Sequence, residues 1–419
     1  MSQAVHPLVH QFDAFAEDYE RGRPGYATEA VEAVVAFLDL RPGRRVLDLG
    51  AGTGKLTRQL AGSGASIVAV EPMPGMRRAL EAAVPGAEVL DGTAEDIPLG
   101  NGSVDAAVMA QAFHWFDQPR ALSELHRVIA PAGGFAIVVN RRDEETPWIA
   151  RMTGLLEAAT GQESPVDTID WRERLPWSGL FDASDELEFR HVHRLDRDGV
   201  IARVTSISTV AALDAPARAD VVRRMHDLLD ADPATSGPEV DVPYQTFVLP
   251  FRRRSPVPGV DGLVVSVNEN AGGVPKPPVE RSVIRRLGLQ GDAHHNPDVH
   301  GGEVAAVCLY SQEAIERVRA DGHQAFPGSY GENLTILGIE WGALRAGMRL
   351  AIGDADAGPL LELTQYATPC QTQARWFTGA RIGRISHAAY PEDARFYARV
   401  LREGPVAAGD PVRVLGPSR

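Results

Sequence analysis

The glycine-rich segment at positions 46–54 (Val-Leu-Asp-Leu-Gly-Ala-Gly-Thr-Gly) has the composition of a ligand-binding turn. A short apolar run that ends in an acid and spaced glycines predicts a buried strand leading into a tight turn. The pattern from Lys55 to Leu60 predicts a helix directly after that turn. Glycines between a strand and a helix N-terminus let a ligand approach the main chain closely, and nucleotides are common ligands there.

Two details restrict the kind of nucleotide. A dinucleotide fingerprint, G-x-G-x-x-G, would place its third glycine at position 55, which is Lys55, whereas the third glycine stands at Gly54. The next apolar run, at positions 67–70, is followed by Glu71. An acid at the tip of the second strand, about 20 residues past the loop, can accept hydrogen bonds from both ribose hydroxyls. We therefore expect a nucleoside ribose here, with no clear demand for a pyrophosphate.

These features resemble the class I S-adenosylmethionine (SAM) dependent methyltransferases, in particular the type 11 group. The resemblance implies that the glycine loop faces the methionine part of SAM and that Glu71 holds the ribose. An N-terminal motif of this branch, Tyr-x-x-x-Arg-Pro-x-Tyr, is matched at positions 19–26, a segment that on spacing alone would be a solvated arm. Residues 91–99 correspond to the loop that cups the adenine, where the acid could be Glu95 or Asp96. The residues assigned to the cofactor by resemblance are Tyr19, Arg23, Asp48, Gly50, Ala51, Gly52, Gly54, Glu71, Pro72, Ala94, Glu95 and Gln111.

The segment 111–117 follows the predicted fourth strand, 104–110, and contains His114 beside Trp115. Ligands of open α/β sheets bind at the carboxyl ends of the strands, so this segment should lie at the mouth of the site. His114 is a candidate catalytic base or substrate contact, and packing of the His114–Trp115 pair against the cofactor or the next helix is an equal alternative. A strong base is not required, because holding donor and acceptor in line can supply much of the rate of methyl transfer.

Strands and helices alternate from position 28 to 140, which predicts an α/β fold with a mostly parallel, Rossmann-like sheet. Helices are expected at about 147–159 and 216–229, and a strand at 242–249. That strand includes Pro243-Tyr244-Gln245-Thr246, which resembles the Pro-Tyr-x-Thr strand closing the family's acceptor-pocket extension. We expect a methyltransferase domain at 1–250 and a linker at 251–260, where prolines surround three consecutive arginines.

Residues 261–419 have a different texture, with short strand-like runs and many glycines that predict a β-rich barrel. Strands are expected at 263–267, 304–309, 349–352 and 360–364, and a helix at 312–320. Three histidines near an acid suggest zinc, but tight Cys-x-x-Cys or His-Glu-x-x-His pairs are absent, so no metal is expected.

Several separated motifs in this half, in the right order, resemble the MOSC domain, named for the C-terminal domain of molybdenum-cofactor sulfurase. The resemblance implies that Cys370 carries sulfur or faces a molybdenum pterin, whereas Cys308, inside a predicted strand, is expected to be a small buried side chain. A reactive Cys370 thiol would need a cationic neighbour, for which Arg285, Arg286 and the histidines are candidates. The pocket residues implied by the resemblance are Asp292, His294, His300, Gly301, Gly302, Glu332, Asn333 and Cys370.

The composition limits the class of protein. The formal net charge of −14 argues against a nucleic-acid-binding surface. No signal peptide and no apolar run of about 18 residues are visible, so neither secretion nor a membrane span is expected. Two cysteines in 419 residues indicate a reducing compartment. We expect a cytoplasmic protein whose partner is a small-molecule acceptor.

The sequence thus predicts a SAM-dependent methyltransferase fused to a MOSC barrel that handles sulfur or binds the molybdenum cofactor. The acceptor is hypothesised to be a small-molecule thiol. The alternative is a carboxylate or hydroxyl acceptor, with the MOSC half a non-catalytic binding or sulfur-carrier module. An NAD-type oxidoreductase is disfavoured by Lys55.

Overall fold

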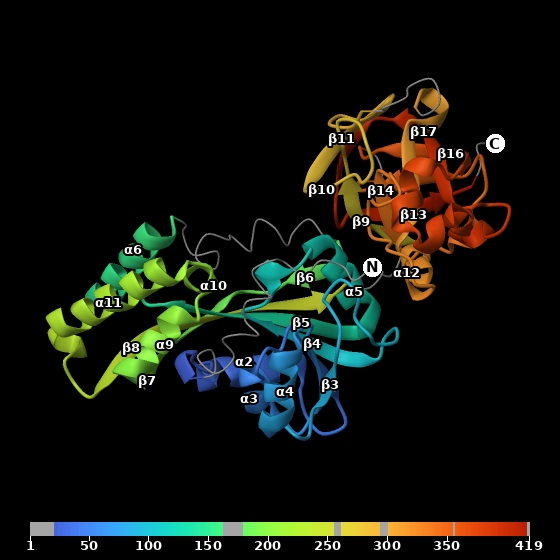
Figure 1. The fold of residues 1–419 in the computed structure, drawn as a ribbon. Coiled ribbons are helices and arrows are strands. Elements are labelled where there is room, and N and C mark those ends of the chain that lie inside the picture. The colour runs from blue at the N-terminus through green and yellow to red at the C-terminus, as the bar shows by residue number, and fades with distance from the viewer. Residues whose placement is uncertain (1–20, 162–178, 255–260, 294–300, 355–356, 417–419) are drawn as a thin grey trace. The chain divides into compact units, whose positions relative to one another are not determined.

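The computed structural model describes residues 21–161, 179–254, 261–293, 301–354 and 357–416. Their contacts divide the chain into two compact units (Figure 1). The first unit comprises residues 1–169 and 183–253, and the second comprises residues 170–182 and 254–419. The short strand β6 (Phe181–Ala183) lies where the chain passes from the second unit back to the first.

The first unit is built on a twisted sheet with the strand order β3-β2-β1-β4-β5-β8-β6, and β7 also pairs with β8. The first five strands of this order are parallel, whereas β8 and β7 are antiparallel to their neighbours. The order reverses between β1 and β4, and such a switch point is where open α/β sheets bind ligands. The strand bounds are β1 (Arg45–Leu49), β2 (Ser66–Val70), β3 (Glu88–Leu90), β4 (Val104–Ala110), β5 (Ile129–Arg142), β7 (Leu187–Asp196) and β8 (Glu239–Arg253).

Helices cover this sheet in two groups. In Figure 1, α2, α3 and α4 lie on one side of it, and α6 and α11 run side by side near β7 and β8. One apolar core joins α2 and α3 to the central strands, and a second core joins α6, α9 and α11 to β7 and β8. The bounds are α2 (Thr28–Leu38), α3 (Lys55–Leu60), α4 (Pro74–Ala83), α5 (Gln118–Val128), α6 (Pro147–Thr160), α9 (Arg197–Thr205), α10 (Ser208–Ala211) and α11 (Ala215–Ala231).

The second unit is a closed barrel of the β-rich kind expected. Its ring runs β9-β14-β13-β17-β16-β15-β19 and returns to β9, around a core of aliphatic side chains with Trp341 and Phe396. A separate small sheet has the order β12-β11-β18, β10 (Pro278–Val279) pairs with β9, and α12 (Gln312–Ala320) follows β13. The remaining bounds are β9 (Gly262–Asn268), β11 (Arg281–Arg285), β12 (Gly288–Leu289), β13 (Val307–Ser311), β14 (Leu334–Leu337), β15 (Arg349–Ile352), β16 (Leu360–Ala367), β17 (Arg395–Arg402), β18 (Gly404–Ala407) and β19 (Pro411–Leu415).

Several elements differ from the sequence-based expectation. The strand expected at 304–309 begins at Val307, after a 3-10 helix at Glu303–Ala305. β5 begins at Ile129, although Pro131 and Gly133 had predicted a break between the preceding helix and the strand. The strand continues through these residues because its pairing with β4 is irregular there and the glycine allows the two backbones to approach. A Cβ at Gly133 would lie 2.3 Å from the Asp105 carbonyl oxygen. β7 was not predicted at all, since most of its outward side chains are polar. β8 extends to Arg253, so two of the three arginines expected in a solvated linker belong to a strand.

Candidate functional site

The glycine loop leaves the end of β1 in a left-handed backbone conformation. Gly50, Gly52 and Gly54 have φ angles of 70°, 57° and 83°, which side-chain-bearing residues rarely adopt. The Gly50 N–H donates to the Val70 carbonyl at 2.8 Å, which ties the turn to the end of β2. A Cβ at Gly50 would lie 2.7 Å from the Ala112 Cβ, whereas a Cβ at Gly52 would meet no atom of the described residues within 4 Å. The loop is therefore packed at Gly50 and open at Gly52.

Glu71 lies directly beyond β2 and is buried against this loop. Its Oε2 accepts a hydrogen bond from the Gly52 N–H at 2.9 Å, and its Oε1 accepts one from the Met73 N–H at 2.9 Å. The Glu71 side chain thus links the β1 turn to the β2 turn.

Asp48 is the second buried acid of the site. Its Oδ2 accepts the Thr57 hydroxyl at 2.6 Å, while its Oδ1 is buried without a hydrogen-bond partner in the described parts of the chain. Burial raises the pKa of Asp48 to about 7; the Thr57 hydrogen bond opposes this shift and the Glu71 charge adds to it. An orphaned buried oxygen beside an open loop fits a ligand that brings hydrogen-bond donors or positive charge.

The end of β4 supplies the opposite side of the switch point. Gln111 has a φ of 53°, uncommon for a non-glycine residue, and its Nε2 donates to the Asn140 carbonyl at 2.7 Å. His114 lies in a short 3-10 turn, with its ring centroid 4.6 Å from that of Trp115. Glu95 accepts the Asp117 N–H at 2.8 Å, whereas Asp96 is exposed. The structure therefore distinguishes the two adjacent acids by their hydrogen bonding and exposure.

The remaining predicted cofactor residues occupy different settings. Ala51 lies in the glycine loop, Pro72 follows Glu71, and Ala94 is buried in the loop after β3. Arg23 donates to the Ser206 carbonyl at 3.1 Å, so this part of the arm reaches the end of α9. Tyr19 lies outside the described residues.

In the second unit, Cys370 is half-buried at the start of a short 3-10 helix. Its Sγ lies 2.8 Å from the Thr372 hydroxyl, and its N–H donates to the Gln373 side chain at 3.1 Å. Arg285 and Arg286 form ion pairs with Glu403 and Glu303 on the surface. Arg395 instead contacts the segment between β16 and Cys370, because its Nη2 donates a hydrogen bond to the Thr368 carbonyl at 3.3 Å. Arg395 was not predicted, because it is distant from Cys370 along the chain.

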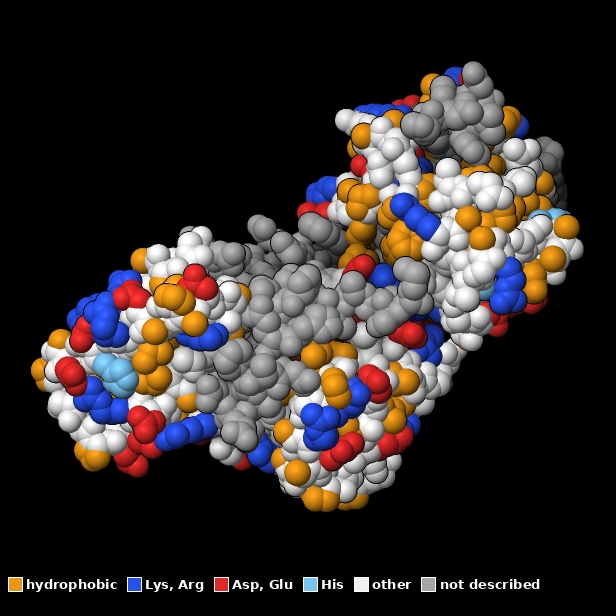
Figure 2. Space-filling view, in the orientation of Figure 1, with side chains coloured by type: hydrophobic (Ala, Val, Ile, Leu, Met, Phe, Trp, Pro, Cys, Tyr) orange, Lys and Arg blue, Asp and Glu red, His pale blue; other side chains and the backbone are white. Residues whose placement is uncertain are grey.

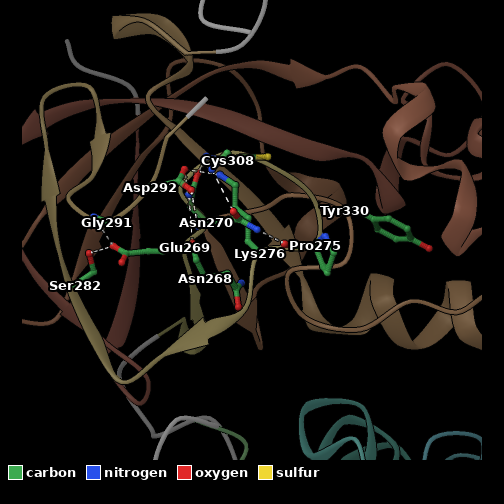
Figure 3. A network of polar contacts seen from close by, with 12 residues as sticks. Asn268, Glu269, Asn270, Pro275, Lys276, Ser282, Gly291, Asp292, Cys308 and Tyr330 are labelled. Carbon is green, nitrogen blue, oxygen red and sulfur yellow. Dashed lines mark hydrogen bonds and ion pairs between the residues drawn. The ribbon is translucent and has the colours of Figure 1, made fainter. Parts of the chain in front are cut away.

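Asp292 and Asn333 belong to one buried polar network, part of which Figure 3 shows around Asp292, Lys276 and Cys308. Asp292 forms an ion pair with Lys276 and accepts the Asn333 Nδ2–H at 2.8 Å, and it also accepts the Asn270 N–H at 3.0 Å. Asn333 in turn accepts the Cys308 N–H at 3.0 Å. The network therefore connects the predicted pocket residues to Lys276, a buried lysine that the sequence did not single out.

Glu332 is fully buried and accepts the Gly328 N–H at 2.6 Å and the Tyr330 N–H at 3.2 Å. Burial raises the pKa of Glu332, against the effect of these hydrogen bonds and of Arg395. Gly301 and Gly302 have positive φ angles, and His294 and His300 lie outside the described residues. Among the residues that the structure describes, no group of three His, Cys, Asp or Glu side chains could hold a metal ion.

Comparison with known protein families finds a different domain in each of the two units. A methyltransferase domain model matches residues 47–137, and a MOSC domain model matches residues 296–413. An uncharacterized methyltransferase of Mycobacterium tuberculosis is 39% identical over 229 residues, which cover 54% of this chain and 89% of that protein. An uncharacterized methyltransferase of Schizosaccharomyces pombe is 34% identical over 187 residues, covering 42% of this chain and 74% of the relative.

The chain belongs to the methyltransferase family. It is a SAM-dependent transferase that also carries a MOSC domain. The methyltransferase match contains the glycine loop, Glu71 and Gln111, while β7 and β8 lie beyond it. The MOSC match contains Cys308 and Cys370, but Lys276 and Asp292 precede it. None of the described helices is both long enough and apolar enough to cross a membrane.

Proposed function

We propose a methyltransferase domain at residues 1–250 and a MOSC domain at 261–419, joined by residues 251–260, of which 251–253 continue β8. Within the first domain we assign SAM to the switch point between β1 and β4. The observation that carries this assignment is the hydrogen bond of the buried Glu71 carboxylate to the Gly52 N–H, at the open side of the glycine loop, with the orphaned Asp48 carboxylate near enough for the Glu71 charge to raise its pKa. Glu71 would hold the ribose hydroxyls, and Asp48 would face the charged methionine part.

When bound, SAM supplies a methyl group already activated by its sulfonium. The chain's own contribution is then to bind and orient. The glycine loop admits the cofactor to the main chain, and Gln111, held in a strained backbone conformation by Val138 and Asn140, lines the carboxyl end of β4. His114 is assigned to acceptor contact at the same edge. Orientation of this kind can supply much of the rate without a dedicated strong base.

We propose that the acceptor is a small molecule with a sulfur nucleophile, because thiolates are strong nucleophiles and the MOSC resemblance concerns sulfur handling. A tether raises the effective concentration of one domain's product at the other where the geometry allows it. The MOSC domain would present or release that sulfur through Cys370, with a molybdenum pterin as its candidate ligand. A carboxylate or hydroxyl acceptor, with the MOSC domain a binding or sulfur-carrier module, is the competing function. In either case we assign the protein to the cytoplasm, acting on small molecules and not on nucleic acid.

Transfer of label from methyl-labelled SAM to a panel of small thiols, carboxylic acids and phenols tests the acceptor. We expect label in a thioether product, at a rate reduced by Cys370→Ala when the MOSC domain must deliver the sulfur. Label passing only to oxygen, at a rate unaffected by Cys370→Ala, would rule out the sulfur acceptor and favour the competing function.

A further inference from the structure

A group of buried polar side chains lies on one face of the β7–β8 pair in the methyltransferase domain. His191 pairs in register with Tyr244, and His193 pairs with Val242, so both histidines share the face that carries Tyr244. Arg203 reaches this face from α9, where its Nε donates to the Tyr244 hydroxyl at 3.0 Å. This group, Arg203, Tyr244, His191 and His193, is called the β7–β8 cluster below.

Arg203 is the charged member of the cluster and is only 8% exposed. Its Nη1 is buried, and no residue in the described part of the chain accepts a hydrogen bond from it or supplies an acid to it. Arg127 in the same domain shows the usual arrangement, because its buried guanidinium is paired with the buried Glu124 carboxylate. A buried guanidinium with no counter-ion among the described residues is suited to bind an anion.

The other members of the cluster are also suited to donate hydrogen bonds. The Tyr244 hydroxyl oxygen accepts a hydrogen bond from Arg203, so the hydroxyl proton of Tyr244 is available to a different acceptor. The Nε2 atoms of His191 and His193 are buried without a partner in the described residues. Figure 2 shows acidic and basic side chains interspersed over the surface of this domain, as in the pairing of Arg223 with Asp220. The β7–β8 cluster consists instead of inward-facing donors; the Glu29 charge reaches His191, where it opposes the lowering of the pKa by burial.

The cluster lies close to the cofactor assignment. The Lys55 ammonium, at the first residue of the helix after the glycine loop, contributes with Arg203 to lowering the pKa of His193 to about 4, for which burial is the main cause. His193 is therefore neutral near pH 7. At the other end of the cluster, the Thr246 hydroxyl lies 3.3 Å from His191 Nδ1 and donates to Asn140, whose carbonyl accepts from Gln111. A chain of contacts thus runs from the cluster to the end of β4, and the Lys55 charge at the helix after the glycine loop acts on His193.

We propose that Arg203 and Tyr244 bind a carboxylate group of the methyl acceptor, so that the acceptor is a small organic acid. This inference rests on the proposed methyl transfer and specifies its substrate class. A carboxylate held by a guanidinium and a phenol is a weak nucleophile, so the bound carboxylate anchors the molecule and a second group, a thiol or another carboxylate, receives the methyl. One buried guanidinium beside a neutral histidine matches a single negative charge better than the double charge of a phosphate monoester.

The carboxylate of SAM itself is the competing anion for Arg203. The two can be separated, because loss of an acceptor anchor should leave cofactor affinity unchanged. Arg194 provides a matched control, since it is an arginine on β7 whose exposed side chain pairs with Asp241.

The experiment compares acceptors that differ only in the anchor: 3-mercaptopropionate against 3-mercapto-1-propanol, and succinate against its monomethyl ester. Methyl transfer from labelled SAM is measured with wild type, Arg203→Gln, Tyr244→Phe and Arg194→Gln. We expect wild type and Arg194→Gln to prefer the acids. Arg203→Gln should raise KM for the acids at least tenfold, the size expected for loss of one charge-assisted contact of about 1.4 kcal/mol. Tyr244→Phe should raise it a few-fold, and neither change should alter KM for the alcohol.

Calorimetry with SAM shows whether each variant is folded and tests the competing anion. If Arg203→Gln weakens SAM binding as much as it weakens acid binding, Arg203 serves the cofactor and the proposal is wrong. The proposal is also wrong if Arg203→Gln binds SAM normally and prefers the acids over their neutral analogues as strongly as wild type does. Where wild type methylates none of the panel, the proposed function fails for these acceptors. Arg203-dependent binding of 3-mercaptopropionate to the complex with S-adenosylhomocysteine would still support the anchor, and equal binding to Arg203→Gln would contradict it.

Discussion

Asp48 and Glu71 are adjacent buried acids that the fold treats differently. Glu71 is stabilised by two backbone N–H donors, whereas Asp48 has one hydroxyl donor and one orphaned oxygen. Hydrogen bonds to a carboxylate favour its charged form and burial disfavours it. Asp48, which has fewer donors, is therefore the acid whose protonation a cationic ligand would change most.

Asp48 makes the stability of the ligand-free domain depend on pH. Because its folded pKa of about 7 exceeds the ordinary 3.8, the native state retains a proton that the unfolded chain loses in this window. The free energy of unfolding contributed by Asp48 therefore falls as pH rises from about 4 to about 7, and is constant above it. Asp48→Asn cannot titrate at this position. Urea unfolding should therefore show that the variant gains stability relative to wild type as pH rises from about 4 to about 7. Asp39→Asn, at an exposed acid, should show no such gain, and a pH-independent difference for Asp48→Asn would contradict the argument.

The two cysteines should differ in reactivity. Cys308 is 5% exposed, and burial raises the pKa of its thiol despite Arg395 and Lys276, whereas Cys370 is half-buried beside Thr372. Only the thiolate reacts rapidly, so iodoacetamide should modify Cys370 in the native protein at least about tenfold faster than Cys308. Peptide mapping by mass spectrometry over time gives both rates, and earlier modification of Cys308 would return Cys370 to a structural role.

At the scale of elements, the turn after β1 separates packing from ligand space. Gly50 and Gly52 both have positive φ angles, so valine at either position pays a similar backbone cost of about 1–2 kcal/mol. At Gly50 the new side chain also collides with Ala112, whereas at Gly52 it enters space that the protein leaves open. Gly50→Val should therefore lower the unfolding midpoint more than Gly52→Val does. Gly52→Val should remain folded and lose at least tenfold in SAM affinity, and normal SAM binding by this variant would contradict the assignment of the open side.

The elements that the sequence predicted best were those with one clear periodicity. β4 (Val104–Ala110), α12 and β15 have the predicted bounds, because each is a buried apolar run or an amphipathic helix. β7 was missed since its outward residues are arginine, glutamate and an exposed valine, which carry little apolar signal. Its inward histidines acquire their setting only through pairing with β8. For the same reason the β7–β8 cluster could not be predicted, although the Pro-Tyr-x-Thr motif did identify the strand that carries Tyr244.

For the whole molecule, two units with separate cores imply separable unfolding. A ligand that binds only the native form of one unit raises the midpoint of that unit's transition, by an amount that grows with ligand concentration. Calorimetric scans with increasing SAM should therefore shift one transition and leave the barrel's transition in place. A matched scan of Glu71→Ala should show a smaller shift at equal SAM. Equal displacement of both transitions in wild type would contradict the assignment of SAM to the first unit alone.

At the same scale, the sequence predicted the two folds but only part of each site. Asp48, Gly52 and Glu71 are close along a strand–turn–helix unit, so local pattern sufficed to place them together. Arg203, Lys276 and Arg395 are distant in sequence from the groups that they contact. No local pattern reports such contacts, because they depend on how β8, the barrel ring and its loops close.

The most direct test of the central assignment is titration calorimetry of the full chain with SAM. Glu71→Ala removes the acid expected to hold the ribose, and Glu88→Ala removes an exposed acid at β3 that pairs with Arg45. The account predicts that Glu71→Ala weakens SAM binding at least tenfold, about 1.4 kcal/mol, while Glu88→Ala binds like wild type. Unchanged SAM affinity in a folded Glu71→Ala protein would contradict it.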